Sequence, residues 1–221
     1  MVREIFAAYI KKLENDVMSM GEMVIAAITD SVQALKTGDI PTAKRIIKED
    51  DLINKKRLEI EEKCVNLIAL QQPVATDLRE IIAILYVITD LERIGDYAEG
   101  IGKIVIMLGK EPLIKPLVDI PLMAEKAIDM LKKGLKAFVS RDAKAAKAIC
   151  KEDDEVDRLH EHAHHELLTC MIEDPKTISR ATPLIWATHN LERMADRVTN
   201  ICERTVYLAT GTMNELKVSC Y

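Results

Sequence analysis

The sequence predicts an all-α protein built from two tandem three-helix bundles. Its 221 residues are 48% hydrophobic and 30% charged, but only 4% are aromatic, and they include 8 glycines and 7 prolines. This composition, with its many alanine, leucine, isoleucine, lysine and glutamate residues, is typical of helical proteins. Five short breaker segments divide the chain into six stretches, and the first three stretches resemble the last three.

The six expected helices follow from the breakers in order. The breakers lie at 37–41, 71–73, 109–121, 140–142 and 174–175, so the helices are expected at about 1–36, 40–70, 74–108, 122–139, 143–173 and from 175 onward. Asp39 and Asp142 are the expected N-caps of the second and fifth helices, and Asp174 with Pro175 opens the sixth. Pro183 lies within the sixth helix, and we expect it in the first turns or at a kink.

Two pairs of matching segments define an internal repeat. The segment 43–51 matches 146–154 at an offset of 103 residues, and 90–96 matches 190–196 at an offset of 100. The lost residues fall in the connection between the second and third helices, where length changes are tolerated. The repeating unit is therefore three helices, and we expect one unit at 1–110 and the other at 119–221, packed side by side or end to end.

Charge and hydropathy exclude several classes of protein. The formal net charge is −5 and the isoelectric point is about 5.6, which disfavours a general nucleic-acid binder or a polybasic membrane-surface protein. The first residues lack the apolar core of a secretory signal, and the longest uncharged run, 64–76, is too short to span a membrane. Five widely spaced cysteines without a Cys-x-x-Cys pair indicate reduced thiols of a cytoplasmic protein.

Carboxylates on a buried helix face are the most informative feature. The run 81–88 is apolar all round, which predicts that the third helix is buried on most sides. Glu92 and Asp96 then follow four residues apart, on one helix face and near the same buried line, and the pair recurs as Glu192 and Asp196. A carboxylate in such a place must be paired or bound to a metal, and carboxylate oxygens suit hard or borderline cations.

Salt bridging is the alternative interpretation of these motifs. Arg93 is placed to pair with Asp90 and Asp96 as on an ordinary helix surface. A second recurring polar pair, Asp51 with Asn54 and Asp154 with Asp157, either completes a metal site or solvates an exposed face.

The histidine-rich segment 160–165 is favoured as part of a solvated or salt-bridged helix. Asp153, Asp157, His160 and His164 nevertheless share one flank beside the core stripe, where an adventitious metal site is the alternative. His160 and His164 are four residues apart, but the first repeat has Arg57 and Glu61 at those positions. The Glu-x-x-His spacing of Glu161 and His164 occurs once, whereas a di-iron bundle needs it twice. No nucleophile motif and no phosphate-binding glycine-rich loop is present, so the sequence predicts no enzyme.

Several motifs together resemble the PhoU family of phosphate-uptake regulators. They are Met20-Gly-Glu22, Gln71-Gln-Pro-Val-Ala-Thr-Asp-Leu-Arg79, Leu91-Glu-Arg-Ile-Gly-Asp96, Leu191-Glu-Arg-Met-Ala-Asp196 and Val206-Tyr-Leu-Ala-Thr-Gly211. The resemblance implies a cytoplasmic protein, often a homodimer, that negatively regulates phosphate uptake. Its implied partners are the ATPase subunit of the phosphate transporter and, in many bacteria, a phosphate-sensing histidine kinase.

The resemblance also implies multinuclear clusters of iron, zinc, manganese or magnesium. Glu92 and Asp96 would hold one cluster and Glu192 and Asp196 the other. The weaker candidates are Asp51, Asp154, Asp157, Glu22 and Glu125. Two further functions stay open, a metal-dependent hydrolase or oxidase that uses the carboxylates and a passive helical scaffold in which the motifs are only salt-bridged.

Overall fold

Six long helices make up the computed structural model, which describes residues 2–212, with side chains from Ile5 onward. The helices are α1 (Val2–Thr37), α2 (Ile40–Gln71), α3 (Thr76–Leu108), α4 (Asp119–Ser140), α5 (Ala143–Glu173) and α6 (Ile178–Thr210). A short 3₁₀ turn, η1 (Pro175–Thr177), precedes α6, and residues 2–212 contain no strand. The predicted all-α class and the division into six helices are therefore confirmed.

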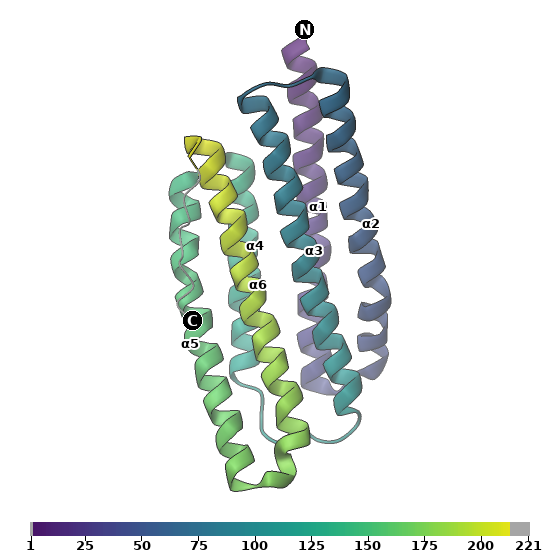
Figure 1. The fold of residues 1–221 in the computed structure, drawn as a ribbon. Coiled ribbons are helices and arrows are strands. Elements are labelled where there is room, and N and C mark those ends of the chain that lie inside the picture. Colours follow the sequence, from purple (N-terminus) through teal and green to yellow (C-terminus); the bar gives the residue numbers. More distant parts are fainter. Residues whose placement is uncertain (1, 213–221) are drawn as a thin grey trace.

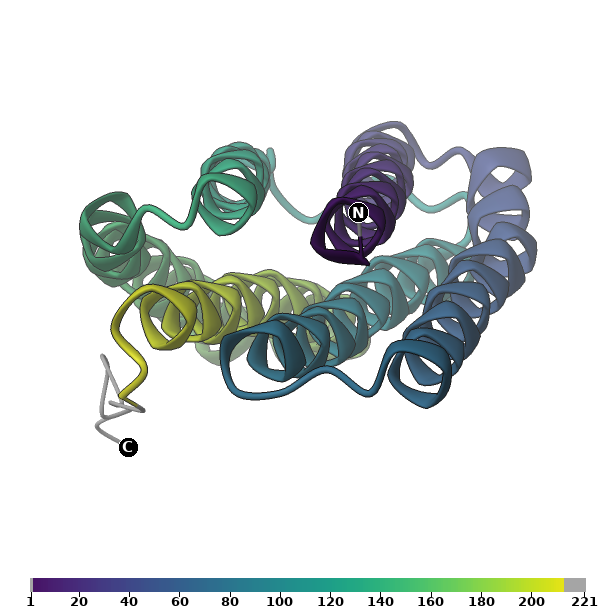
Figure 2. The same ribbon diagram turned by 90° about the horizontal axis from the view of Figure 1, so that it is seen from above.

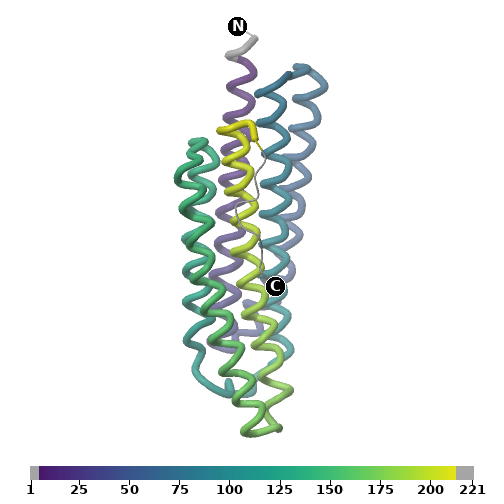
Figure 3. The backbone as a smooth tube through the Cα atoms, turned by 60° about the vertical axis from the view of Figure 1, so that its left-hand side comes forward, coloured from purple at the N-terminus to yellow at the C-terminus, as the bar shows by residue number. Residues whose placement is uncertain are grey.

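The two bundles pack side by side along one long axis (Figures 1 and 3). Seen from above, α2, α3, α6 and α5 form one curved layer, and α1 and α4 lie together on one side of it (Figure 2). The antiparallel helices α3 and α6 adjoin at the centre, and a single hydrophobic core runs through both bundles. The exact division into units at 1–110 and 119–221 stays a prediction, because the core itself is continuous.

Local sequence explains where the helices begin and end. Asp39 accepts a hydrogen bond from the backbone N–H of Thr42, and Asp142 accepts from those of Lys144 and Ala145, so both predicted N-caps are confirmed. Each cap follows a residue with positive φ, Gly38 in the first repeat and Arg141 in the second. The repeat thus preserves the α1–α2 turn as the α4–α5 turn.

Pro41, Pro121 and Pro183 lie inside helices without interrupting them. Pro183 lies in the second turn of α6, in agreement with the prediction. Pro121 was expected to end the linker before the fourth helix, but α4 already begins at Asp119. The first turn tolerates proline because its backbone N–H groups have no partner within the helix.

The third helix is buried on most of its surface, but not all round. Ile81, Ile84 and Ile88 are buried, whereas Ile82 and Tyr86 are exposed. The central position of α3, against α1, α2 and α6, explains why apolar residues occupy so much of its circumference. No helix in the described part of the chain is long and apolar enough to cross a membrane. Cys64, Cys150, Cys170 and Cys202 form no disulfide bond among the described residues, and Cys220 lies outside them.

Candidate functional site

The first acidic cluster lies in the seam between α2 and α3. Glu92 and Asp96 project from successive turns of α3, and their side chains are only partly exposed. Asp50 of α2 approaches them across the seam. Burial, with repulsion from the carboxylates of Asp96 and Glu99, raises the pKa of Asp50 to about 6. Such a group holds its negative charge at a cost, which a bound cation would offset.

Basic side chains of the chain partly neutralise this cluster. The Nε of Arg57 lies 4.0 Å from Oε1 of Glu92, and Arg93 lies 3.2 Å from Asp96 and 3.6 Å from Glu92. The salt-bridge interpretation is therefore correct for Arg93 with Asp96. It is wrong for Arg93 with Asp90, because Asp90 turns toward α6 and contacts Arg197 and Asn200 instead.

One carboxylate oxygen of the first cluster has no hydrogen-bond donor. The Oδ2 of Asp50 accepts a bond of 2.8 Å from Asn54, while its buried Oδ1 has no hydrogen-bond partner among residues 2–212. Gly95 brings α3 close at this point, since a Cβ atom there would lie 3.5 Å from the same Oδ1. A buried acceptor oxygen without a donor is a suitable ligand for a cation.

The second acidic cluster occupies the equivalent seam between α5 and α6. Asp153 is fully buried there, at the position that Asp50 has in the first repeat. Burial, with repulsion from the carboxylates of Asp196, Asp157 and Asp153, raises the pKa of Glu192 to about 7, although Arg193 acts in the opposite direction. Four carboxylates therefore converge on this seam.

Imidazoles replace the arginine in the second cluster. His160 stands at the position of Arg57, and its ring is stacked on His164 with 6.0 Å between the centroids. His189 lies 6.2 Å from His160, and its Nδ1 is 3.5 Å from Oε2 of Glu192. Burial lowers the pKa of His160, and its buried Nδ1 has no hydrogen-bond partner within the described chain. Neutral imidazole nitrogens are ligands for zinc and other transition metals.

The structure separates the predicted candidates into two groups. Glu92 and Asp96 lie in the first cluster, and Glu192, Asp196 and Asp157 in the second. The remaining candidates are exposed. Glu22 and Glu125 lie on α1 and α4, outside both seams, and Asp51 and Asp154 are exposed on α2 and α5. The histidines divide likewise, since His160 and His164 are half-buried whereas His162 and His165 are exposed.

The neighbouring carboxylates Asp50 and Asp153 take the place expected for Asp51 and Asp154. A shift of one residue turns a side chain by 100° around a helix, which here separates the seam from solvent. The sequence spacing could have indicated that Asp50 faces the interior, because it follows Ala43 and Ile46 and precedes Ile53, all of them buried, at steps of three and four residues.

Comparisons with known proteins find the same internal repeat. The sequence matches the family model described as PhoU domain twice, over residues 17–105 and 120–205. It is 40% identical over 217 residues to the phosphate-specific transport system accessory protein PhoU homolog of Clostridium acetobutylicum, covering 98% of this chain and 99% of that protein. The homolog from Pseudomonas aeruginosa is 37% identical over 94% of this chain and 86% of its own length.

Two solved structures are similar in fold. The crystal structure of the phosphate transport system regulatory protein PhoU from Streptococcus pneumoniae has a TM-score of 0.88 at 32% identity, covering 95% of this chain and 99% of its own. That of PhoU from Pseudomonas aeruginosa has the same TM-score at 37% identity, covering 94% and 100% of the two chains.

Proposed function

Because the chain belongs to the PhoU family, we propose that it is a negative regulator of phosphate uptake that acts in the cytoplasm by binding the ATPase subunit of a phosphate ABC transporter. The names of its relatives, accessory and regulatory proteins of phosphate transport, support this role. The alignments extend over nearly the whole of these proteins, so the comparison concerns the entire chain. A protein of this kind acts by contact rather than by catalysis. A phosphate-sensing histidine kinase is the second proposed partner, and a homodimer the proposed assembly.

Exposed aromatic side chains at equivalent positions support a role in protein contact. Tyr86 of α3 and Trp186 of α6 are related by the repeat offset of 100 residues, and both are about half exposed. Aromatic residues are enriched in protein interfaces because they bury a large area at a low entropy cost. The guanidinium of Arg204 lies 3.8 Å from the centroid of the Tyr86 ring, which holds that ring in place.

We propose further that divalent metal ions bind in the two acidic clusters. In the first cluster the ligands would be Asp50, Glu92 and Asp96. In the second they would be Asp153, Asp157, Glu192 and Asp196, joined by His160. Bound metal supplies positive charge that neutralises the buried carboxylates. The hydrogen-bond acceptor Oδ1 of Asp50 and the Nδ1 of His160, both buried and without hydrogen-bond partners among residues 2–212, support this assignment.

The recurrence of a carboxylate cluster in the same seam of both repeats is the observation that carries the metal proposal. The two clusters differ in the protein side chains that neutralise their carboxylates. Arg93 and Arg193 contact the equivalent aspartates of the two clusters. Arg57, however, contacts Glu92 in the first cluster, whereas the second has His160 at that position and His189 at 3.5 Å from Glu192. The second cluster is therefore the stronger proposed metal site.

A binding experiment tests the function. The purified chain and the fourfold variant Glu92→Ala, Asp96→Ala, Glu192→Ala, Asp196→Ala are compared for metal content by elemental analysis and for binding to the transporter ATPase by surface plasmon resonance. We expect the variant to lose metal and to bind the ATPase at least tenfold more weakly. The matched control is Asp51→Ala with Asp154→Ala, which removes two exposed carboxylates and should change neither quantity.

The other outcomes separate the alternatives. Undiminished binding by the fourfold variant would contradict a role for the clusters in docking. Absence of metal from both proteins would leave a helical scaffold with salt-bridged motifs. Turnover of a phosphate ester by the metal-loaded chain, abolished in the fourfold variant, would instead indicate a hydrolase.

A further inference from the structure

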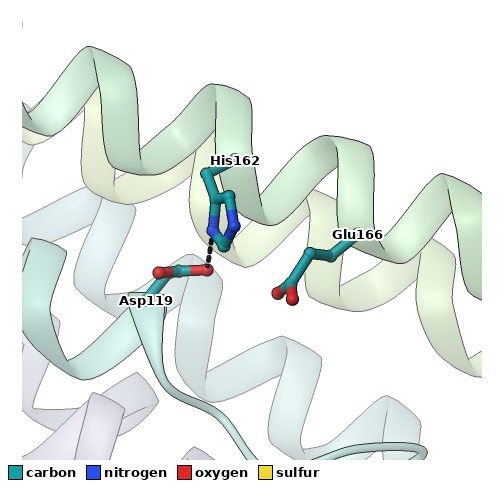
Figure 4. Close-up of side chains that lie close together, drawn as sticks. All are labelled: Asp119, His162 and Glu166. Atoms are coloured by element: carbon teal, nitrogen blue, oxygen red, sulfur yellow. Dashed lines mark hydrogen bonds and ion pairs between the residues drawn. The ribbon is translucent and has the colours of Figure 1, made fainter.

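Three side chains that commonly bind metals meet where the linker enters the second bundle (Figure 4). Asp119 is the first residue of α4, and His162 and Glu166 lie one turn apart on α5. The Nδ1 of His162 is 2.9 Å from Oδ2 of Asp119, and one ligand atom from each of the three residues lies within 4.8 Å of the other two. None of these residues belongs to the acidic clusters described above.

The first repeat shows what normally balances the carboxylate at this position. Asp16 is the equivalent of Asp119 at the repeat offset of 103 residues. Two lysines of α2 hold it, with Nζ of Lys56 at 2.6 Å and Nζ of Lys63 at 2.7 Å. The chain thus supplies two positive charges to this carboxylate in the first repeat.

The second repeat has lost both of those lysines and gained metal-binding groups in the same place. At the repeat offset of 103 residues, Leu159 occupies the position of Lys56, Glu166 that of Lys63, and His162 that of Glu59. A carboxylate that is only 8% exposed therefore faces an imidazole and a second carboxylate instead of two ammonium groups. An imidazole nitrogen can bind a metal ion, whereas the ammonium group of a lysine has no lone pair to offer.

We propose that Asp119, His162 and Glu166 bind one divalent cation of the zinc type. One imidazole nitrogen and two carboxylate oxygens form a donor set that zinc accepts, with the fourth position left to water. Ligand atoms about 2.0 Å from a tetrahedral zinc ion lie about 3.3 Å from one another. The His162 and Asp119 atoms are 2.9 Å apart and the Glu166 oxygen lies within 4.8 Å of both, so the first pair must open by a few tenths of an ångström and the Glu166 carboxylate must move inward to bind the ion.

Lys115 competes with the cation for Glu166. It lies in the linker between α3 and α4, residues 109–118, and forms an ion pair with the Glu166 carboxylate. Its hydrogen bond lowers the pKa of that carboxyl group. Binding of the cation displaces this ammonium group and ties α4 to α5. The linker lysine therefore weakens the site, and its removal should strengthen metal binding.

Calorimetric titration with zinc tests the proposal in a background whose acidic clusters have lost their carboxylates on α3 and α6. The chelator-treated full chain carries the fourfold substitution of Glu92, Asp96, Glu192 and Asp196 by alanine. We expect it to bind one equivalent of zinc. His162→Ala and Glu166→Gln should each weaken this binding about 100-fold or more, since changes outside the ligand shell alone cost 10- to 100-fold.

Two further variants distinguish this site from surface histidines. His165→Ala, an exposed neighbour on the same helix, should leave zinc binding unchanged, and Lys115→Met should tighten it by up to about fivefold, the value of an exposed ion pair. In the otherwise wild-type chain, His162→Ala should reduce the stoichiometry by one equivalent, which keeps the test independent of how the fourfold background folds.

Three results would overturn the proposal. In the first, His162→Ala and Glu166→Gln bind zinc as tightly as their background does. In the second, His165→Ala loses as much zinc affinity as those two variants. In the third, the background binds no zinc, and His162→Ala does not change the zinc stoichiometry of the wild-type chain. If zinc binds at Asp119, His162 and Glu166 but no metal is found in the two acidic clusters, only the metal proposal for those clusters is contradicted.

Discussion

Asp90 of α3 accepts a hydrogen bond of 3.3 Å from the Nδ2 of Asn200 on α6, and this contact joins the two bundles. Arg197 of α6 lies 3.6 Å from the same carboxylate oxygen, and Asp90 is only 8% exposed. Burial raises the pKa of Asp90, while Asn200 and Arg197 act against that rise. At the equivalent position of the second repeat, the uncharged Asn190 lies against Gly100. The α3–α6 contact is therefore charged at one end and neutral at the other.

Replacing Asp90 by alanine should destabilise the protein by about 2 to 3 kcal/mol, because Arg197 and Asn200 lose their partner between the bundles. Asp90→Asn keeps an acceptor oxygen and should cost less. Urea denaturation measures both free energies of unfolding. An equal loss in the two variants would show that the carboxylate contributes only through its charge, against our interpretation of the hydrogen bond.

The lysine-bound carboxylate Asp16 should make stability depend on pH in the acid range. Burial alone would raise the pKa of Asp16, but the hydrogen bonds from Lys56 and Lys63 outweigh burial and lower it. A carboxyl group whose pKa is lower in the folded state stabilises that state above its unfolded pKa, and this contribution is lost as the pH falls through the folded value. Asp16→Asn should therefore reduce the free energy of unfolding at pH 7 by about 1 kcal/mol. The difference from the wild type should shrink as the pH falls below about 4, the usual pKa of an unfolded aspartate. Thermal unfolding at a series of pH values checks this, and a difference that persists at low pH would contradict it.

Glycine permits close approach of α2 and α3 at Gly102. A Cβ atom there would lie 3.3 Å from the backbone oxygen of Ala43, which belongs to a buried turn of α2 and cannot easily move. Gly102→Ala should destabilise the protein, despite the gain of about 1 kcal/mol in helix propensity. Gly100→Ala is the matched control, because its Cβ would meet only the end of the Asn190 side chain, which can rotate away. Unfolding midpoints measured in parallel should fall for the first variant and not for the second.

The two acidic clusters should differ in metal content. Arg93 and Arg193 make equivalent contacts with Asp96 and Asp196, but Arg57 contacts the first cluster and His160 replaces it in the second. Removing Glu192 and Asp196 should therefore reduce bound metal per chain by more than removing Glu92 and Asp96. Elemental analysis of the two double alanine variants measures this.

A substitution within the first cluster provides the converse test. Arg57→His gives that cluster the imidazole of the second and removes one of the two guanidinium groups that contact its carboxylates, so metal content should rise. Equal losses in the two double variants, together with no gain in Arg57→His, would contradict the role assigned to arginine as an internal cation.

Much of the fold follows from the sequence because helix limits depend on local signals. Asp39 and Asp142 cap their helices as expected, and the recurring segments correctly indicated two bundles of three helices. The candidate site was predicted where a recurring motif and an apolar face coincided, as at Glu92 and Glu192. The sequence analysis missed the cluster residue that reaches the motif from a neighbouring helix, which is Asp50 of α2.

The sequence by itself determined the helices, the repeat and the acidic motifs on α3 and α6. Tertiary structure decided which groups meet across the seams: Asp50 rather than Asp51, Arg197 rather than Arg93 beside Asp90, and His162 with Asp119 across 43 residues of chain. The physical reason is that neighbours within a helix follow from its period of 3.6 residues. Neighbours between helices depend on how each helix is rotated and placed against the next, which the packing of the whole core sets.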